Sequence, residues 1–224
     1  RLLPRPSGES DRMTSPPSSK PSSRKNPSQT RLLLVRHGQP PWNAAGRWQG
    51  HADPGLTEVG RAQAIALAEE LASRTLRPWL RLFVSDLSRA KETAEPIATA
   101  LDVPLLIDPR LRELDVGRWS GLTRAEIVAS DRERLLAFES GDLAIRPGGG
   151  ESRIELAERA RAFARDVASR FPNEAQIVVT HLGIIRALAP GQEPANTQAI
   201  EIEAEAAVAP VESSRTRSDS DAPL

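Results

Sequence analysis

Short runs of apolar residues alternate along this chain with segments of helical periodicity. Residues 32–35 and 177–179 are continuous apolar runs, and each predicts a buried β-strand. Residues 80–84 predict another strand, and residues 105–107 form a further short candidate. The apolar and polar alternation over residues 198–203 predicts an edge strand. The chain therefore contains enough strands to form a sheet.

The segments between these strands predict helices. A helix is expected after Thr57, a residue type that caps helix N-termini, because apolar side chains recur at i, i+3, i+4 and i+7 from Ala64. A second apolar stripe covers residues 90–101. Ser152 and Glu155 have the spacing of a capping box and open a long third helix. Alternating strands and helices predict an α/β fold: a three-layer sandwich whose sheet is mostly parallel and carries helices on both faces.

The two ends of the chain differ in composition from its middle. Residues 1–30 are rich in proline and serine, and residues 211–224 are polar, so both predict disordered tails around one domain at residues 31–210. The basic excess of the first tail is compatible with an arm for nucleic acid or an anionic surface. The absence of aromatic residues and of a dense Lys/Arg block there favours a solvated tail.

Composition excludes several classes of function. The 30 basic and 30 acidic residues balance, so no overall field favours nucleic acid or membrane. The chain has no cysteine, which excludes disulfides, thiolate metal sites and cysteine nucleophiles. Its 3 histidines lack zinc-motif spacing, so we expect neither metal nor cofactor. The absence of an apolar run long enough to cross a bilayer, and of a secretory signal, predicts a cytoplasmic protein.

Arginine and histidine side chains follow the predicted strands. Arg36 and His37 come directly after one strand, His181 lies just past another, and Arg89 lies one helical turn beyond a third. The carboxyl ends of parallel strands meet at one edge of a sheet, where ligands of such folds bind. Arginine matches phosphate with paired donors, and imidazole serves as nucleophile or donor. One such residue alone is more often structural, but the repetition at several strand ends predicts a phosphate site.

Motifs around these residues resemble the histidine phosphatase superfamily, the phosphoglycerate mutase-like proteins. The resemblance extends over residues 31–203 in the order and spacing of that family. It is carried by LVRHGQ at residues 34–39 with Asn43 beyond it, GRWQG at 46–50, LTEVG at 56–60, SDLSRAKETA at 85–94, LRE at 111–113, GGES at 149–152 and THLGIIR at 180–186.

The resemblance implies a phosphoglycerate mutase-like fold and a metal-independent phosphomonoester hydrolase of the small broad-specificity branch, acting on a small phosphorylated metabolite. It implies that His37 becomes a phosphohistidine and that Glu113 protonates the leaving oxygen. The positions implied to bind the phosphoryl group are Arg36, Arg89, His181 and Asn43. We add the loop residues Gln49 and Gly50 as candidate substrate contacts.

Two other functions fit the same motifs: phosphoryl transfer of the phosphoglycerate mutase type, and a weakly catalytic phosphate-binding regulator. The sequence also departs from the family. Pro40 stands where threonine is usual, and Ser120 replaces a commonly acidic residue. Only a short segment separates His181 from Pro190, where a longer helix and loop are expected. This shortening brings the packing around His181 into question. Neither the physiological substrate nor the oligomeric state is indicated.

Overall fold

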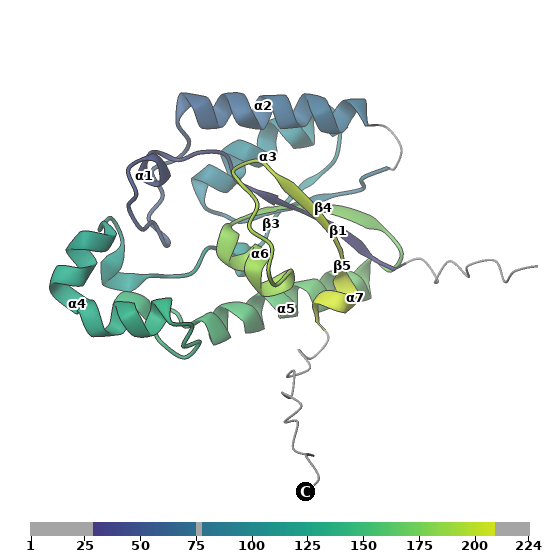
Figure 1. The fold of residues 1–224 in the computed structure, drawn as a ribbon. Helices are drawn as coiled ribbons and strands as arrows, with labels where there is room; N and C mark the ends of the chain where they lie inside the picture. The colour runs from purple at the N-terminus through teal and green to yellow at the C-terminus, as the bar shows by residue number, and fades with distance from the viewer. Residues whose placement is uncertain (1–28, 75–77, 209–224) are drawn as a thin grey trace, which may run out of the picture.

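A computed structural model describes residues 29–74 and 78–208 of the chain. The two predicted tails lie outside these residues, apart from residues 29 and 30. The described part contains a sheet with strand order β3-β2-β4-β1-β5, in which β5 alone runs antiparallel to its neighbour (Figure 1). The strands are β1 (Arg31–Arg36), β2 (Leu82–Val84), β3 (Leu105–Ile107), β4 (Ala175–Thr180) and β5 (Ala199–Glu203).

Helices cover both faces of this sheet. In Figure 1, α2 and α3 lie above it, α5, α6 and α7 lie below it, and α4 stands to one side. This is the three-layer α/β arrangement that the sequence predicted. The helices are α1 (Pro41–Ala44), α2 (Glu58–Ser73), α3 (Ser88–Leu101), α4 (Arg124–Glu139), α5 (Arg153–Arg170), α6 (Leu182–Leu188) and α7 (Ala204–Ala207), with 3-10 turns at Pro109–Leu111, Gly117–Trp119 and Pro147–Gly149.

The alternation of side chains along β1 divides the core between the two faces. Leu33 and Val35 belong to the cluster beneath α2 and α3, whereas Leu32 and Leu34 belong to the cluster that packs on α5 and α6. Successive strand residues point to opposite faces, so an apolar run without polar interruptions is what a sheet covered on both sides requires.

The sequence pattern did not predict α4. The helix begins with a capping box between Thr123 and Glu126 and deviates from helical dihedral angles at Asp131. Its buried residues are few, and Phe138 packs edge-on against Trp48 with ring centroids 5.6 Å apart. A stripe this sparse gives little periodic signal. The helix forms one wall of the cleft described below.

The short helix α6 is well packed. Ile184 and Ile185 are fully buried, Leu188 is nearly so, and His181 at its N-cap has no exposed surface. The short segment after His181 therefore does not leave this histidine loosely packed. Within the described ranges, no helix combines the length and apolar character needed to cross a membrane.

Candidate active site

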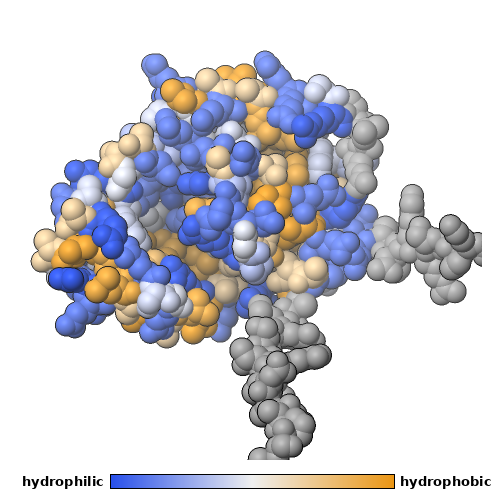
Figure 2. Space-filling view, in the orientation of Figure 1, coloured by the Kyte–Doolittle hydropathy of each residue, from blue (hydrophilic) through white to orange (hydrophobic). Residues whose placement is uncertain are grey.

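A cleft of about 800 Å³ opens beyond the carboxyl end of β1, between α4, α5 and α6. Figure 2 shows hydrophobic residues in the hollow between α4 and α6. All but one of the predicted site residues line the cleft; these are Arg36, His37, Asn43, Gln49, Gly50, Arg89 and Glu113. The fold thus brings together residues that are far apart in the sequence.

The His37 ring is held in one tautomer. Its Nδ1 lies 2.7 Å from the Gly38 carbonyl oxygen, which can only accept a hydrogen bond, so Nδ1 carries the proton. The lone pair is then on Nε2. Burial, followed by the charges of Arg89 and Arg36, lowers the pKa of His37 to about 3, although the Gly38 carbonyl opposes this shift. The ring is therefore neutral near pH 7, as a nitrogen nucleophile must be.

His181 lies against His37 but does not line the cleft. The two ring centroids are 5.0 Å apart. The Nε2 atom of His181 is 2.9 Å from the Ser85 hydroxyl oxygen, whereas its Nδ1 is buried without a hydrogen-bond partner. Burial, with the nearby charge of Arg89, holds the pKa of His181 well below its usual value. A buried ring nitrogen without a partner marks a position where an incoming group can complete the hydrogen bonding.

Two arginine side chains are anchored to backbone carbonyls beside His37. The guanidinium of Arg36 donates to the Pro194 oxygen at 3.0 Å. That of Arg89, 1% exposed, donates to Ala52 and Gly50 oxygens, both at 2.8 Å. Burial is the main cause that lowers the pKa of both groups, but arginine stays protonated in proteins. The Nε atoms of both are buried without partners, so each keeps a donor available.

The Glu113 carboxylate faces the first turn of α6. Its Oε1 accepts from the backbone N–H of Leu114 at 2.8 Å and of Gly183 at 3.1 Å. A Cβ at Gly183 would lie 2.2 Å from that same oxygen, so glycine is needed for the close approach. Glu113 is half-buried and lines the cleft, where a carboxyl can exchange protons with a bound group.

Asn43 and Gln49 lie together at the edge of the cleft. The side-chain amide of Gln49 donates to the Asn43 oxygen at 3.1 Å, and Ser120 donates to the Gln49 backbone oxygen at 2.8 Å. The loop residue His51 is directed elsewhere, with Nε2 2.8 Å from the Glu113 carbonyl oxygen. Ser120, a departure from the family pattern, therefore supports the loop that carries Gln49.

Several residues at the site were not predicted as functional. Ser85 contacts His181 as described above. Asp53 accepts from the backbone N–H groups of Ser88 and Arg89 and lies 3.6 Å from the Arg89 guanidinium. Ser85 stood inside a recognised motif and could have been singled out, whereas Asp53 had no such signal. The outer cleft adds Trp48, Leu114, Val116, Phe138, Leu143, Ile154 and Leu156 as apolar walls, with Arg47, Arg153, Arg161 and Arg186 among them.

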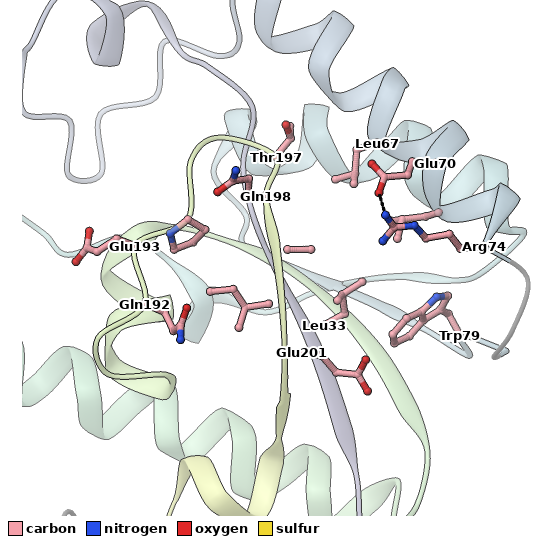
Figure 3. Close-up of a pocket in the computed structure, with 14 residues that line it drawn as sticks. Leu33, Leu67, Glu70, Arg74, Trp79, Gln192, Glu193, Thr197, Gln198 and Glu201 are labelled. Atoms are coloured by element: carbon pink, nitrogen blue, oxygen red, sulfur yellow. Dashed lines mark ion pairs between the residues drawn. The ribbon is translucent and has the colours of Figure 1, made fainter.

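A larger groove of about 1010 Å³ lies away from these residues. Figure 3 shows it between the end of α2, the strands β1 and β5, and the segment before β5. Its described lining includes none of the predicted site residues. Among the described residues, no group of three or more His, Asp or Glu side chains is placed to hold a metal ion. The predicted phosphate site therefore lies in the cleft at the end of β1.

The sequence profile of the histidine phosphatase superfamily, branch 1, matches residues 32–220. This chain belongs to the histidine phosphatase superfamily. A metal-independent phosphoserine phosphatase from Arabidopsis thaliana is 44% identical over 162 residues, which cover 71% of this chain and 67% of the relative. A glucosyl-3-phosphoglycerate phosphatase from Mycobacterium tuberculosis is 38% identical over 166 residues, covering 70% of this chain and 73% of that relative.

The fold agrees with this membership. A solved mycobacterial glucosyl-3-phosphoglycerate phosphatase in complex with VO3 superimposes with a TM-score of 0.69 and 33% sequence identity, covering 76% of this chain and 90% of that one. The predicted family and the phosphoglycerate mutase-like fold of this histidine phosphatase are therefore confirmed.

Proposed function

We propose that this histidine phosphatase hydrolyses small phosphomonoesters through a phosphohistidine at His37. Its class, a phosphoric monoester hydrolase, follows from the family and from relatives that are named phosphatases. The observation that carries the residue assignment is the contact between His37 Nδ1 and the Gly38 carbonyl. This contact leaves the Nε2 lone pair available beside the buried Arg89 and the half-buried Arg36. Phosphoserine and glucosyl-3-phosphoglycerate, the substrates named for those relatives, are candidate substrates.

In the first step, His37 Nε2 attacks phosphorus and the ester P–O bond breaks. Arg36 and Arg89 neutralise the charge that spreads over the equatorial phosphoryl oxygens. Glu113, protonated at this stage, gives its proton to the leaving oxygen. The products are an alcohol and a phosphoimidazole, and Glu113 is left as a carboxylate.

In the second step, Glu113 takes a proton from water as the water oxygen attacks phosphorus. The N–P bond breaks, inorganic phosphate leaves and His37 regains its lone pair, while Glu113 is protonated again for the next cycle. Asn43, Gln49 and Gly50 contact the phosphoryl group or the adjoining part of the substrate from the edge of the cleft.

His181 assists by donating from Nδ1 to a phosphoryl oxygen. Because phosphoryl oxygens only accept, this role requires Nε2 to carry the lone pair and the Ser85 hydroxyl to donate to it. The 2.9 Å separation between His181 Nε2 and Ser85 Oγ suits that bond, and the buried Nδ1 has no other partner. Ser85 is then the residue that sets the tautomer of His181.

The positive charge that this reaction needs comes from the arginines, so we expect neither a metal nor a cofactor requirement, in line with the relative named metal-independent. We also keep the predictions of a small-molecule substrate, of no nucleic-acid or membrane partner, and of a cytoplasmic location. The balanced charge of the chain supports the partner prediction, and the absence of cysteine fits a reducing compartment.

Trapping the covalent intermediate tests the proposal. Brief incubation with a substrate labelled in the phosphoryl group, followed by an alkaline quench, is expected to leave acid-labile label on the peptide that contains His37. His37→Ala should carry no label. EDTA should leave turnover unchanged. Label that persists in His37→Ala, or turnover that EDTA abolishes, would contradict the mechanism.

A further inference from the structure

Most arginines in the described part of the chain have a carboxylate partner. In the cleft itself, Arg47 pairs with Glu126 at 3.1 Å, and Arg186 pairs with Glu193 at 2.6 Å. Elsewhere in the described chain, pairing is more common still. An arginine that is sheltered from water and lacks a carboxylate is therefore an exception that calls for a ligand.

Within the described ranges, three arginines are half-buried and make no ion pair, and all three line the cleft. They are Arg36, Arg153 and Arg161. The other unpaired arginines of this part of the chain are exposed to water, which solvates their charge. Arg36 is accounted for by the phosphoryl group, which leaves two sheltered charges on α5 without a role.

Arg153 is fixed in place by aromatic packing. Its guanidinium carbon lies 3.7 Å from the centroid of the Phe138 ring, and its Nη1 donates to the Phe138 carbonyl oxygen at 3.0 Å. Burial and the charge of Arg186 lower its pKa, in line with the absence of an ion pair to Arg153 in the described structure. A guanidinium held over an aromatic ring is restrained in position, and its remaining N–H groups can bind a planar anion.

Arg161 stands further along the same helix. Its Nε is buried and has no hydrogen-bond partner, and no ion pair involves its guanidinium in the described structure. The nearest acidic lining residue on α5, Glu158, is exposed and makes no ion pair with it. Two turns of helix, about 12 Å, separate the Cα atoms of Arg153 and Arg161.

Resting on the proposed function, we infer that Arg153 and Arg161 select phosphomonoesters that carry a second anionic group, a carboxylate. The phosphoryl group occupies the end of the cleft at His37, the apolar walls contact the body of the substrate, and the α5 arginines bind the carboxylate. Charge-assisted bonds from arginine to a carboxylate are strong and directional. The acids named for two relatives, phosphoserine and a phosphoglycerate derivative, contain both groups.

The test uses matched substrates that differ in the carboxylate. Phosphoserine is compared with phosphoethanolamine, and 3-phosphoglycerate with glycerol 3-phosphate. We expect kcat/KM to favour the acid by roughly tenfold or more in each pair. Arg153→Gln or Arg161→Gln should reduce this ratio to below about threefold. Arg165→Gln, at an exposed arginine of α5 outside the cleft, is the matched control and should keep the wild-type ratio.

Binding separates this inference from the proposed reaction. Dissociation constants of the same four esters, measured by calorimetry on His37→Ala, should show the same preference, and the α5 substitutions should remove it. If the preference appears in binding but no ester is hydrolysed, the proposed function is wrong and the inference stands. If hydrolysis proceeds without a carboxylate preference in either pair, or if both α5 variants keep the wild-type ratio, the inference is wrong.

Discussion

The protonation state of the His37 ring is set by its own backbone neighbour and by burial. The Gly38 carbonyl accepts the Nδ1 proton, and Asn196 donates to the His37 and Gly38 carbonyl oxygens at 2.8 and 3.2 Å. These contacts fix the ring without adding a carboxylate, so the Gly38 carbonyl alone favours its protonated form, and burial outweighs it. The proposed nucleophile is thus kept neutral, and the free energy that this costs should appear in the stability of the protein.

The first prediction concerns that cost. Below about pH 6.5 the unfolded chain protonates this histidine, whereas the folded protein does so only near pH 3, so folding loses stability as the pH falls through this window. Replacing the group with the uncharged His37→Asn should remove about 3 kcal/mol of the stability lost between about pH 7.5 and pH 4.5. Urea denaturation of both proteins at the two pH values measures this. Equal losses in both would contradict the lowered pKa.

Glu113 is the residue proposed to supply the proton to the leaving oxygen. Glu113→Gln cannot protonate a leaving alcohol, so kcat for alkyl phosphates should fall roughly 10²–10⁴-fold. Activated aryl phosphates need little protonation and should lose much less activity. Steady-state kinetics on the two substrate types give the comparison. Equal losses on both would mean that Glu113 has only a structural role, through its bond to the Gly183 N–H.

At the scale of elements, the N-terminus of α2 packs directly on Gly38 and Gln39, the residues that follow His37. A Cβ added at Gly60 would lie 2.3 Å from the Gln39 carbonyl oxygen, and one at Gly38 would lie 2.6 Å from the Gly60 oxygen. Thr57, the N-cap of α2, also donates to the Gln39 oxygen at 3.1 Å. The backbone after His37 is therefore held by the first turn of this helix.

Gly60→Ala tests this packing by the sign of its effect. In an open helix, alanine would stabilise by up to about 1 kcal/mol relative to glycine. Here the contact with backbone should instead destabilise by about 2 kcal/mol and lower kcat, because the Gly38 carbonyl moves. Denaturation and kinetics measure both effects, with Glu69→Ala on the exposed side of α2 as control. A gain in stability would show that the backbone at Gly38 and Gln39 can move away from the added Cβ without a loss of stability.

The sequence predicted those elements whose buried positions carry apolar side chains in a regular pattern. The continuous runs of β1 and β4 and the capped helices α2 and α5 are confirmed, since burial alone determines their patterns. Helix α4 was not predicted, because only Ile127, Leu135 and Phe138 are buried along it. Its position depends on contacts with aromatic residues far away in the sequence.

The inner end of the site was predictable for a topological reason, and the outer end was not. Arg36 is the last residue of β1, and its register partner Thr180 directly precedes His181, so their proximity follows from the parallel sheet. Arg153 and Arg161 have no such signal. Both are charged residues on a helix that is mostly polar outside its core stripe, and only the packing of α4 and α6 shows which face lines the cleft.

At the scale of the whole molecule, the short connection between α6 and β5 completes the site. Its Pro194 oxygen accepts from Arg36, and its Asn196 side chain donates to the His37 backbone. The shortened segment therefore helps to hold Arg36 and His37, two residues of the proposed catalytic site. It provides little chain, however, to cover the cleft during a reaction.

Because little chain is available to cover the cleft, we expect hydrolysis to exceed mutase transfer. A mutase must retain the dephosphorylated product and exclude water while the product reorients. Supplied with 3-phosphoglycerate, with and without 2,3-bisphosphoglycerate, the protein should release phosphate faster than it forms 2-phosphoglycerate. Both products are measured in the same reaction. Isomer formation that is faster and is stimulated by the bisphosphate would make phosphoryl transfer the primary activity.

The residues proposed for the chemistry and the walls of the cleft come from different parts of the chain. Arg36, His37 and Arg89 lie at strand ends or one turn beyond, whereas most of the wall belongs to one stretch between Leu114 and Arg161. Exposed wall residues in that stretch, such as Leu143 and Ile154, lie outside the strands whose register places Arg36 and His37, so their substitution should leave that register unchanged. Substitutions in this single segment can therefore change which phosphorylated metabolite the cleft accepts. Chimeras that exchange the segment between relatives would show the same change of substrate.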